Sequence, residues 1–167
     1  YPAAFEAALG QVMASKLGFS KSMDGDLRLA MDLLDCMAKG DADFTNTFRY
    51  LSNSIDIDPI DGSLARLEFS DPSIFDEWLI RWKERIKLEQ VSPKELGNVM
   101  RAANPAVIPR NHLVESAIRA AEEFGDFAPF NDLVDEVNRP FESRELGSIY
   151  IRPPNSDEVV YQTFCGT

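Results

Sequence analysis

The sequence predicts an all-α protein: an irregular bundle of about six or seven helices followed by an extended C-terminal tail. Three observations lead to this prediction. Apolar residues recur at three- and four-residue steps between capping residues, glycines and prolines, which is typical of amphipathic helices. No segment alternates apolar and polar residues between hairpin turns, so a substantial sheet is not expected. Hydrophobic residues make up 44% of the 167 residues, enough for a core.

Three helices are expected in the first third of the chain. The first covers residues 2–17 and is broken by Gly18. The second begins at Asp24 or Asp26 and ends at Gly40, which suits a left-handed C-terminal position. Asp43 opens a third, residues 44–51. The apolar residues that recur along these three helices are Phe5, Leu9, Val12, Met13 and Leu17; Leu27, Met31, Leu34 and Met37; and Phe44, Phe48 and Leu51.

Residues 53–70 are expected to form the longest internal loop, because the sequence there is irregular and rich in turn signals. Asp71 and Pro72 then read as an N-cap and a first-turn proline. The helix that follows should form the main core seam through Phe75, Trp78, Leu79, Trp82 and Ile86. Ser92 and Glu95 form a capping box for the next short helix.

Two more helices are expected before the chain loses its periodicity. One carries Leu113, Ala117, Ala120, Ala121 and Phe124 as its stripe and stops at Gly125. The last is capped by Asp126, carries Phe130, Leu133, Val134 and Val137, and is ended by Pro140. We therefore expect a helical domain over residues 1–141 and an extended tail over residues 142–167. The best strand candidates are residues 149–151 and 159–161.

Charge and composition argue against several functions. The formal net charge of −11 argues against nucleic-acid binding, since phosphate contacts need clustered Lys and Arg. The densest basic stretch, residues 81–87, is expected to be a solvated helix face. No apolar run approaches the ~20 residues needed to cross a bilayer, and no signal-peptide pattern opens the chain. We expect neither a nucleic-acid partner nor a membrane partner.

Two features concern where the protein works and how complete it is. Two cysteines, Cys36 and Cys165, are too few for a secreted disulfide scaffold. A reducing compartment is therefore expected, cytoplasmic or, in a eukaryote, mitochondrial. The chain opens on Tyr1 rather than Met, and we expect it to be a piece of a longer protein.

The residues for independent chemistry are not found. His112 is the single histidine, placed in the first turn of an expected helix, and a hydrogen-bonding role is favoured over catalysis. One histidine and two distant cysteines cannot supply a zinc site. Residues 56–62 alternate carboxylates like a calcium loop but lack its final Glu, which favours a capped turn. No phosphate-binding loop or nucleophile elbow occurs. We assign no catalytic, cofactor-binding or metal-binding residue and no cofactor to this chain.

Three stretches, in order from about Leu9 to Phe141, carry a family resemblance. They are Lys16-Leu17-Gly18-Phe19 with Asp43-Phe44-Thr45-Asn46-Thr47-Phe48-Arg49-Tyr50-Leu51; Met100-Arg101-Ala102-Ala103-Asn104-Pro105 with Ile108-Pro109-Arg110-Asn111-His112-Leu113 and Ala117-Ile118; and Gly125-Asp126-Phe127 to Leu133 with Arg139-Pro140-Phe141. They resemble the C-terminal part of the selenoprotein O family, protein adenylyltransferases with a kinase-like fold.

The resemblance implies that the whole protein transfers AMP from ATP, with Mg²⁺, to Ser, Thr or Tyr hydroxyls of protein substrates. The family's Gly-rich loop, ATP-contacting Lys and Mg-binding Asn and Asp lie upstream of the segment represented here. ATP and Mg are therefore expected in the parent protein and not in this fragment. The parent is expected to be an enzyme, and this chain a non-catalytic helical segment that supports the upstream kinase-like core.

The resemblance also singles out Cys165 as a candidate redox residue. Members of the family end with a cysteine or selenocysteine third from the terminus, and Cys165 stands there. A second cysteine often precedes it by three residues, but Gln162 occupies that position, so a local Cys-x-x-Cys pair is not available. Cys36, among apolar residues of the second helix, is expected to be partly buried and unbonded to Cys165. The partner of Cys165 is then expected in the absent part of the protein.

Two alternatives stay open at the level of sequence. The chain could be an independent helical protein-interaction module without an enzymatic role, which an open reading frame beginning near Tyr1 would favour. Arg110 and Asn111 either contact the missing core or hold the turn after Pro109, where a helix start needs polar groups.

Overall fold

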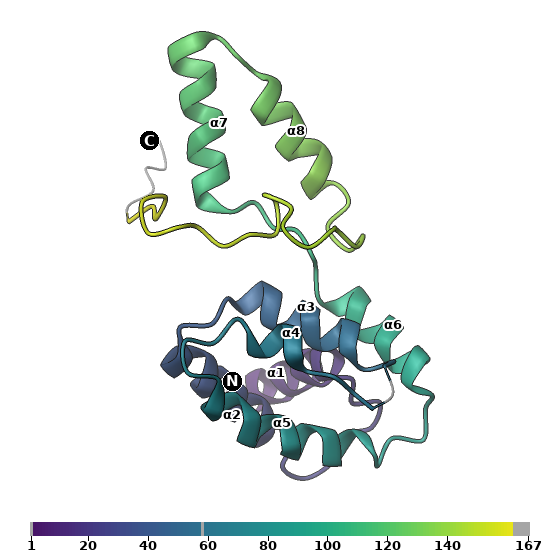
Figure 1. The fold of residues 1–167 in the computed structure, drawn as a ribbon. Helices are drawn as coiled ribbons and strands as arrows, with labels where there is room; N and C mark the ends of the chain where they lie inside the picture. The colour runs from purple at the N-terminus through teal and green to yellow at the C-terminus, as the bar shows by residue number, and fades with distance from the viewer. Residues whose placement is uncertain (1, 58, 162–167) are drawn as a thin grey trace. The chain divides into compact units, whose positions relative to one another are not determined.

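The computed structural model describes residues 2–57 and 59–161 and confirms the all-α prediction for them (Figure 1). Within these residues there are eight helices and no strand, so residues 149–151 and 159–161 do not pair as strands. The helices are α1 (Pro2–Leu17), α2 (Asp26–Gly40), α3 (Phe44–Ser54), α4 (Ser63–Arg66), α5 (Pro72–Ile86), α6 (Pro93–Ala103), α7 (Asn111–Phe124) and α8 (Ala128–Val137).

The chain divides into two compact units, Tyr1–Asn104 and Pro105–Thr167. The first unit contains α1 to α6, and the second contains α7, α8 and the segment that follows them. The sequence did not indicate this division. The expected boundary at residue 141 concerns where helices give way to a tail, and it stays a prediction.

An aromatic column on α5 forms the centre of the first unit. Phe75, Trp78 and Trp82 are all 0% exposed. The ring centroids of Phe75 and Trp78 are 5.7 Å apart, those of Trp78 and Trp82 are 6.0 Å apart, and both pairs are stacked. Phe69 extends the column, with its centroid 4.6 Å from that of Phe75. The prediction that this side of α5 is the main core seam is confirmed.

The two indole N–H groups join α5 to α1 and α2. Trp82 Nε1 donates to the carbonyl of Leu17 at 2.9 Å, and Trp78 Nε1 donates to the carbonyl of Leu29 at 2.8 Å. Leu17 is the last residue of α1, and its carbonyl has no partner inside the helix. Each tryptophan therefore buries its ring while satisfying both its own donor and a backbone acceptor.

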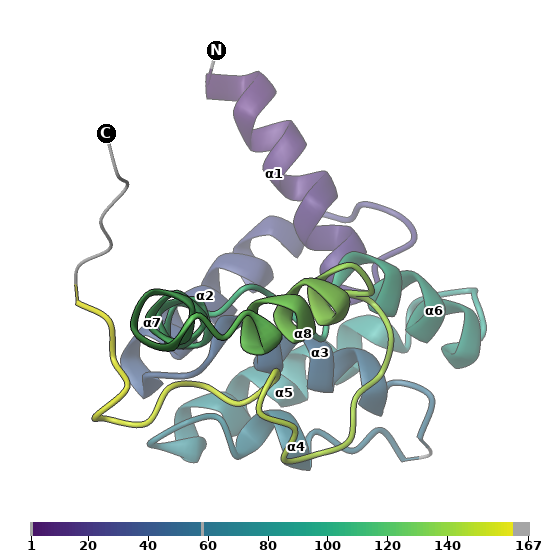
Figure 2. The ribbon, with the colours of Figure 1, turned by 90° about the horizontal axis from the view of Figure 1, so that it is seen from above.

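The stripe predicted for α1 is only partly buried. Met13 and Leu17 are buried, whereas Phe5 is 63% exposed and Val12 is 54% exposed. In Figure 2 the first turns of α1 extend away from the other helices of the first unit. Gly18 ends the helix as predicted, with φ at 79°.

Of the four apolar residues singled out for α2 in the sequence, the structure buries Met37 alone. Leu29, Leu33 and Met37 are buried, whereas Met31 is 40% exposed and Leu34 is only partly buried. Apolar residues occupy most sides of this helix, so its periodicity alone allowed more than one buried face. The contact with α5, which includes the bond from Trp78 to the Leu29 carbonyl, decides which side is buried.

Gly40 was predicted to take the left-handed position, but Asp41 takes it, with φ at 51°. Gly40 remains inside α2 and is buried there. A Cβ atom at Gly40 would lie 2.7 Å from Cδ1 of Phe69, closer than any real contact. The glycine is therefore required for the close approach of Phe69 rather than for its backbone freedom.

The other predicted helix starts are largely confirmed. Asp43 accepts from the backbone N–H of Asn46 at 2.8 Å, and Asp71 accepts from that of Ser73 at 3.0 Å. The capping box of α6 is present, with both bonds between Ser92 and its glutamate partner. The predicted loop over residues 53–70 is shorter than expected, because α3 extends through its first two residues and α4 lies within it.

Little of the second unit is buried. Within α7 and α8 the buried residues are His112, Ala117 and Leu133. The stripes predicted for these helices were therefore largely wrong: Phe124 is 78% exposed and Phe130 is 52% exposed. A small separate core contains Ala106, Val107 and Ile151, with Val137 and Tyr150 packed against it.

No helix in residues 2–57 and 59–161 is long and apolar enough to cross a membrane.

Replacing Trp82 by Ala should lower the free energy of unfolding by about 3–5 kcal/mol, because a fully buried ring leaves a cavity and an unpaired Leu17 carbonyl. Urea unfolding followed by circular dichroism measures this. Ile80→Ala is the matched control on the same helix: Ile80 is 63% exposed, and its change should stay within about 0.5 kcal/mol. A loss below about 1 kcal/mol for Trp82→Ala would contradict the assignment of the core.

Candidate functional site

The first two stretches singled out in the sequence meet at the side chain of Asn104, which is 0% exposed. Its Nδ2 donates to the carbonyl of Lys16 at 2.9 Å and to Oγ of Ser52 at 2.8 Å. Its Oδ1 accepts from Nζ of Lys16 at 3.0 Å. One amide thus joins the C-terminal end of α1, the last turn of α3 and the residue after α6.

Two arginines reinforce the same junction. Arg49 is 4% exposed, and its NH1 donates to the carbonyl of Arg101 at 3.1 Å and to that of Asn104 at 3.0 Å. These carbonyls belong to the end of α6, where backbone acceptors have no helical partner. Arg101 in turn donates to the carbonyl of Ser52 at 3.0 Å and to Asp56 at 3.2 Å.

The ammonium group of Lys16 is partly buried at this junction. Its Nζ lies 5.0 Å from the ring centroid of Phe48 and 5.4 Å from that of Phe44. Burial lowers its pKa from the ordinary value. The cation is held by the two rings and by the Asn104 oxygen, an arrangement that stabilises a partly desolvated ammonium group.

A second buried polar cluster was missed by the sequence reasoning. Arg85 lies in the basic stretch predicted to be a solvated face, yet it is 9% exposed. Its guanidinium donates to both carboxylate oxygens of Asp26, at 2.7 and 3.1 Å, and to Glu89 at 2.7 Å. It also lies 4.5 Å from the ring centroid of Phe19. The only signal in the sequence was the position of Arg85 three residues after Trp82, which puts both on one side of α5.

In the second unit Arg110 holds the segment that follows α8. Its NH2 donates to the carbonyl of Ile151 at 2.9 Å, and the residue is 6% exposed. Although Arg110 is the residue before α7, its side chain makes no capping bond there. The neighbouring Asn111 is exposed. The arginine therefore stabilises the fold of the unit, through the returning segment rather than through the helix start.

His112 follows in the first turn of α7 and is 8% exposed. Its Nε2 is buried and has no hydrogen-bond partner among the described residues. Burial lowers its pKa below the ordinary value; the Glu158 carboxylate opposes this shift, while Arg152 and Arg110 add to it. A hollow of about 380 Å³ lies beside it, lined also by Glu115, Ser116, Arg119 and residues 157–160.

Glu158 shapes the charge beside His112. Arg152 donates to both of its carboxylate oxygens, at 2.6 and 2.7 Å, and the backbone N–H of Asn155 donates at 2.8 Å. These bonds lower the pKa of Glu158 to about 2. The tail is therefore folded back on itself here, just before the described residues end at 161.

The candidate redox residue Cys165 lies outside the described residues. Cys36 is described, and it is half-buried as predicted. Its Sγ lies 3.7 Å from the carbonyl oxygen of Ile74, and burial raises the pKa of its thiol. A raised pKa leaves little thiolate at neutral pH, so Cys36 is a poor nucleophile.

The described part of the chain holds no group of three or more His, Cys, Asp or Glu side chains that could bind a metal ion. In the calcium-loop-like stretch, Asp56 pairs with Arg101 at 3.2 Å, and Asp61 accepts from the backbone N–H of Ser63 at 2.9 Å. These carboxylates are thus engaged in an ion pair and a cap; Asp58 between them lies outside the described residues.

Comparison with known proteins gives a consistent result. Residues 1–138 match the profile of the family described as protein adenylyltransferase SelO. The protein nucleotidyltransferase YdiU of Rhodopseudomonas palustris (strain HaA2) is 45% identical over 163 residues, which are 98% of this chain and 33% of that protein.

Two other relatives carry the same description. The one from Bradyrhizobium diazoefficiens is 44% identical over 167 residues, 100% of this chain and 34% of its own length. The one from Nitrobacter winogradskyi is 45% identical over 163 residues, 98% of this chain and 32% of its own length. The chain therefore spans about a third of the length of these relatives.

Asn104→Ala should lower the free energy of unfolding by about 1–3 kcal/mol, because the Lys16 carbonyl and the Ser52 hydroxyl lose a partner inside the protein. Chemical denaturation measures this loss. Asn98→Ala is the control, since Asn98 is exposed and its side chain accepts from the Arg101 side chain on its own helix. Equal stability of the two variants would show that the Asn104 junction does not hold the unit.

His112 should titrate below about 6.5, its ordinary value, in the folded chain and near that value in urea. Since the unfolded state then binds the proton more readily, the second unit should lose stability as the pH falls below about 6.5. The single histidine makes its NMR imidazole resonance unambiguous. Glu158→Gln should lower the pKa of His112 further, because an opposing negative charge is removed. A pKa at or above the ordinary value would contradict the burial of the imidazole.

Proposed function

Because the chain belongs to the protein adenylyltransferase SelO family, we propose that it is the helical C-terminal part of a longer enzyme. That enzyme transfers AMP from ATP to Ser, Thr or Tyr hydroxyls of proteins. The observation that carries this proposal is the family match over residues 1–138 in a chain only a third as long as its nucleotidyltransferase relatives. The remaining two thirds are where we place the kinase-like core, with ATP and Mg²⁺ bound by residues outside this chain.

The role we propose for this chain is to support that core without taking part in the chemistry. The polar groups of the family stretches in the first unit favour this role. The amide of Asn104 and the guanidinium groups of Arg49 and Arg101 bond to backbone carbonyls and to neighbouring side chains of the same unit. Groups committed in this way fix the positions of helices and are not free to bind a nucleotide. The compartment that goes with this proposal is cytoplasmic, or mitochondrial in a eukaryote.

The other candidate is an independent helical interaction module. The observation in its favour is the exposed apolar surface of α7 and α8, where Phe124 and Phe130 are more than half exposed. The two candidates differ in what precedes Tyr1 in the gene. An upstream reading frame with a Gly-rich loop, a Lys and the Asn and Asp set favours the enzyme; a start near Tyr1 favours the module.

We also propose that Cys165 is a redox-responsive thiol. Its thiolate would attack a disulfide and form a mixed disulfide, releasing the other sulfur as a thiol. The high pKa and partial burial of Cys36 make it an unsuitable partner, so the partner cysteine is placed in the rest of the parent protein.

To test the adenylyltransferase proposal, the parent and this chain are purified separately and incubated with labelled ATP, Mg²⁺ and candidate protein substrates. The parent should transfer AMP and the chain alone should not, because the nucleotide site is placed outside it. Calorimetric titration should likewise show no binding of ATP–Mg²⁺ to the chain. Micromolar binding to the chain alone, or an inactive parent with an intact upstream motif set, would contradict the proposal.

The redox proposal is tested by alkylation under non-reducing conditions followed by peptide mapping. Cys165 should be alkylated much faster than Cys36, because burial raises the pKa of the Cys36 thiol and limits access to it. In the oxidised parent, Cys165 should appear in a disulfide with a cysteine outside this chain. A stoichiometric Cys36–Cys165 crosslink would overturn the assignment.

A further inference from the structure

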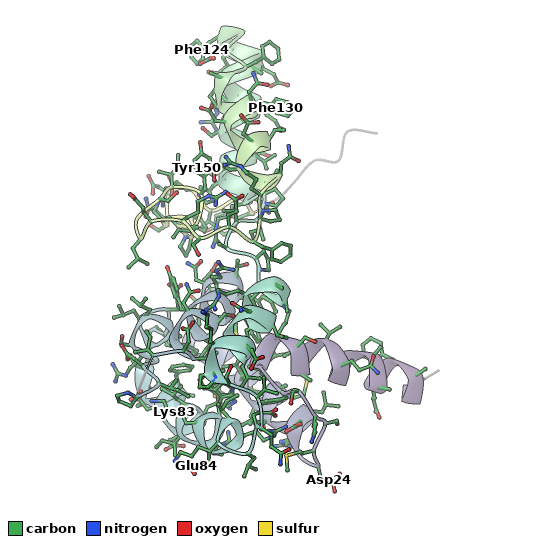
Figure 3. All side chains as sticks on the ribbon, turned by 90° about the vertical axis from the view of Figure 1, so that its right-hand side faces the viewer. Asp24, Lys83, Glu84, Phe124, Phe130 and Tyr150 are labelled. Atoms are coloured by element: carbon green, nitrogen blue, oxygen red, sulfur yellow. The ribbon has the colours of Figure 1, made fainter. Side chains whose placement is uncertain are left out.

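The α7–α8 pair presents an apolar face that the second unit leaves uncovered. Ile118, Phe127 and Phe130 line one hollow of about 220 Å³ together with Ala117, Ala121 and Glu122. Exposed fractions are 45% for Ile118, 60% for Phe127 and 52% for Phe130. Figure 3 shows Phe130 and Phe124 on the outside of the two-helix ribbon. We call this surface, with Phe124 and Val134, the hairpin face.

The hairpin face is continuous rather than a scatter of single apolar residues. Phe130 and Val134 are four residues apart and so lie on one side of α8, and Phe127, the residue just before this helix, lines the same hollow as Phe130. The small side chains of Ala117 and Ala121 on α7 leave the hollow between the two helices. A contiguous exposed patch of this kind marks an interaction site in a folded protein.

The charged side chains of α7, α8 and the turn between them are almost all negative. From residue 111 to residue 137 there are seven acidic side chains and one basic one, a formal net charge of −6 out of −11 for the whole chain. They are Glu115, Glu122, Glu123, Asp126, Asp132, Asp135 and Glu136, against Arg119. Glu122 lines the hollow itself. Two copies of this face would bring their Glu122 carboxylates into one interface, where like charges oppose association.

We propose that the hairpin face is the docking surface for the part of the parent protein that lies outside this chain. The surface it meets is an apolar ridge that fills the hollow. Lys and Arg side chains border this ridge and pair with Glu122 and with other acidic side chains of α7 and α8. This inference rests on the proposed function, since it requires a parent. Two arguments carry it: about two thirds of the relatives' length lies beyond this chain, and the net negative charge of α7 and α8, with Glu122 in the hollow, favours a basic partner over a second copy.

The test compares the reactivity of a thiol introduced by Phe130→Cys in the isolated chain and in the full parent. Peptide mapping separates this thiol from the native cysteines. In the parent its alkylation should be about tenfold slower or more, which corresponds to about 1.4 kcal/mol of docking free energy. Asp132→Cys is the matched control, because helical periodicity puts Asp132 on the opposite side of α8. Its alkylation rate should be the same in both proteins.

A second measurement avoids any change in the hairpin face. Amide hydrogen exchange of α7 and α8 should be slower in the unmodified parent than in the isolated chain, because docking suppresses local opening.

The role of charge is tested by two further variants of the parent. Glu122→Lys should restore part of the reactivity of the Phe130→Cys thiol, and Glu6→Lys should not. Glu6 is an exposed acid on α1, so it controls for net charge. Raising the salt concentration should also increase the reactivity of the Phe130→Cys thiol in the parent, since salt screens the attraction between the acidic side chains of α7 and α8 and a basic partner.

Three outcomes would overturn the inference. Equal alkylation in parent and chain means that the face is uncovered in both. Slow alkylation in the isolated chain that depends on protein concentration means that a second copy covers it. No effect of Glu122→Lys or of salt means that the partner surface is not basic. AMP transfer by the same parent sample separates these results from failure of the proposed function, which an inactive parent would indicate.

Discussion

The first unit depends on the way the side chain of Asn104 joins three helices that are far apart in the sequence. An asparagine amide has two donors and one acceptor group, and here all of them bond to α1 and α3 from a fully buried position. A buried amide with all its bonds made fixes the arrangement of its neighbours, whereas one with a missing partner would destabilise the fold. The carbonyls at the ends of α1 and α6 are satisfied in the same way, by Trp82 and Arg49.

The two units use their apolar residues differently. In the first, the aromatic column of α5 is stacked and fully buried, and its polar atoms bond to backbone carbonyls. In the second, three aliphatic residues, Ala106, Val107 and Ile151, form the core, and Phe124 of α7 and Phe130 of α8 remain exposed. A unit built like the first is suited to hold a fixed shape, and a surface like the hairpin face is suited to contact another part of a protein.

The candidate site could be predicted only in outline. The resemblance drew attention to Lys16, Arg49, Arg101 and Asn104 as parts of separate stretches, but nothing in their spacing indicated that they meet. Arg85 was misplaced because a basic run reads as a solvated face, and its carboxylate partner Asp26 is 59 positions away in the sequence. The partly buried state of Cys36 was correctly predicted, since it stands among apolar residues of a helix.

The sequence by itself determined that the protein is helical and where most helices begin, because caps such as Asp43, Asp71 and Ser92 act on the backbone within three residues. Which face of a helix is buried was decided only by the tertiary structure. In α2 several faces were apolar enough, and contact with Trp78 selected one. In α7 and α8 the stripes buried Ala117 and Leu133 but left Phe124 and Phe130 exposed in the second unit. Periodicity records that a helix has an apolar side, and only the neighbouring elements determine what covers it.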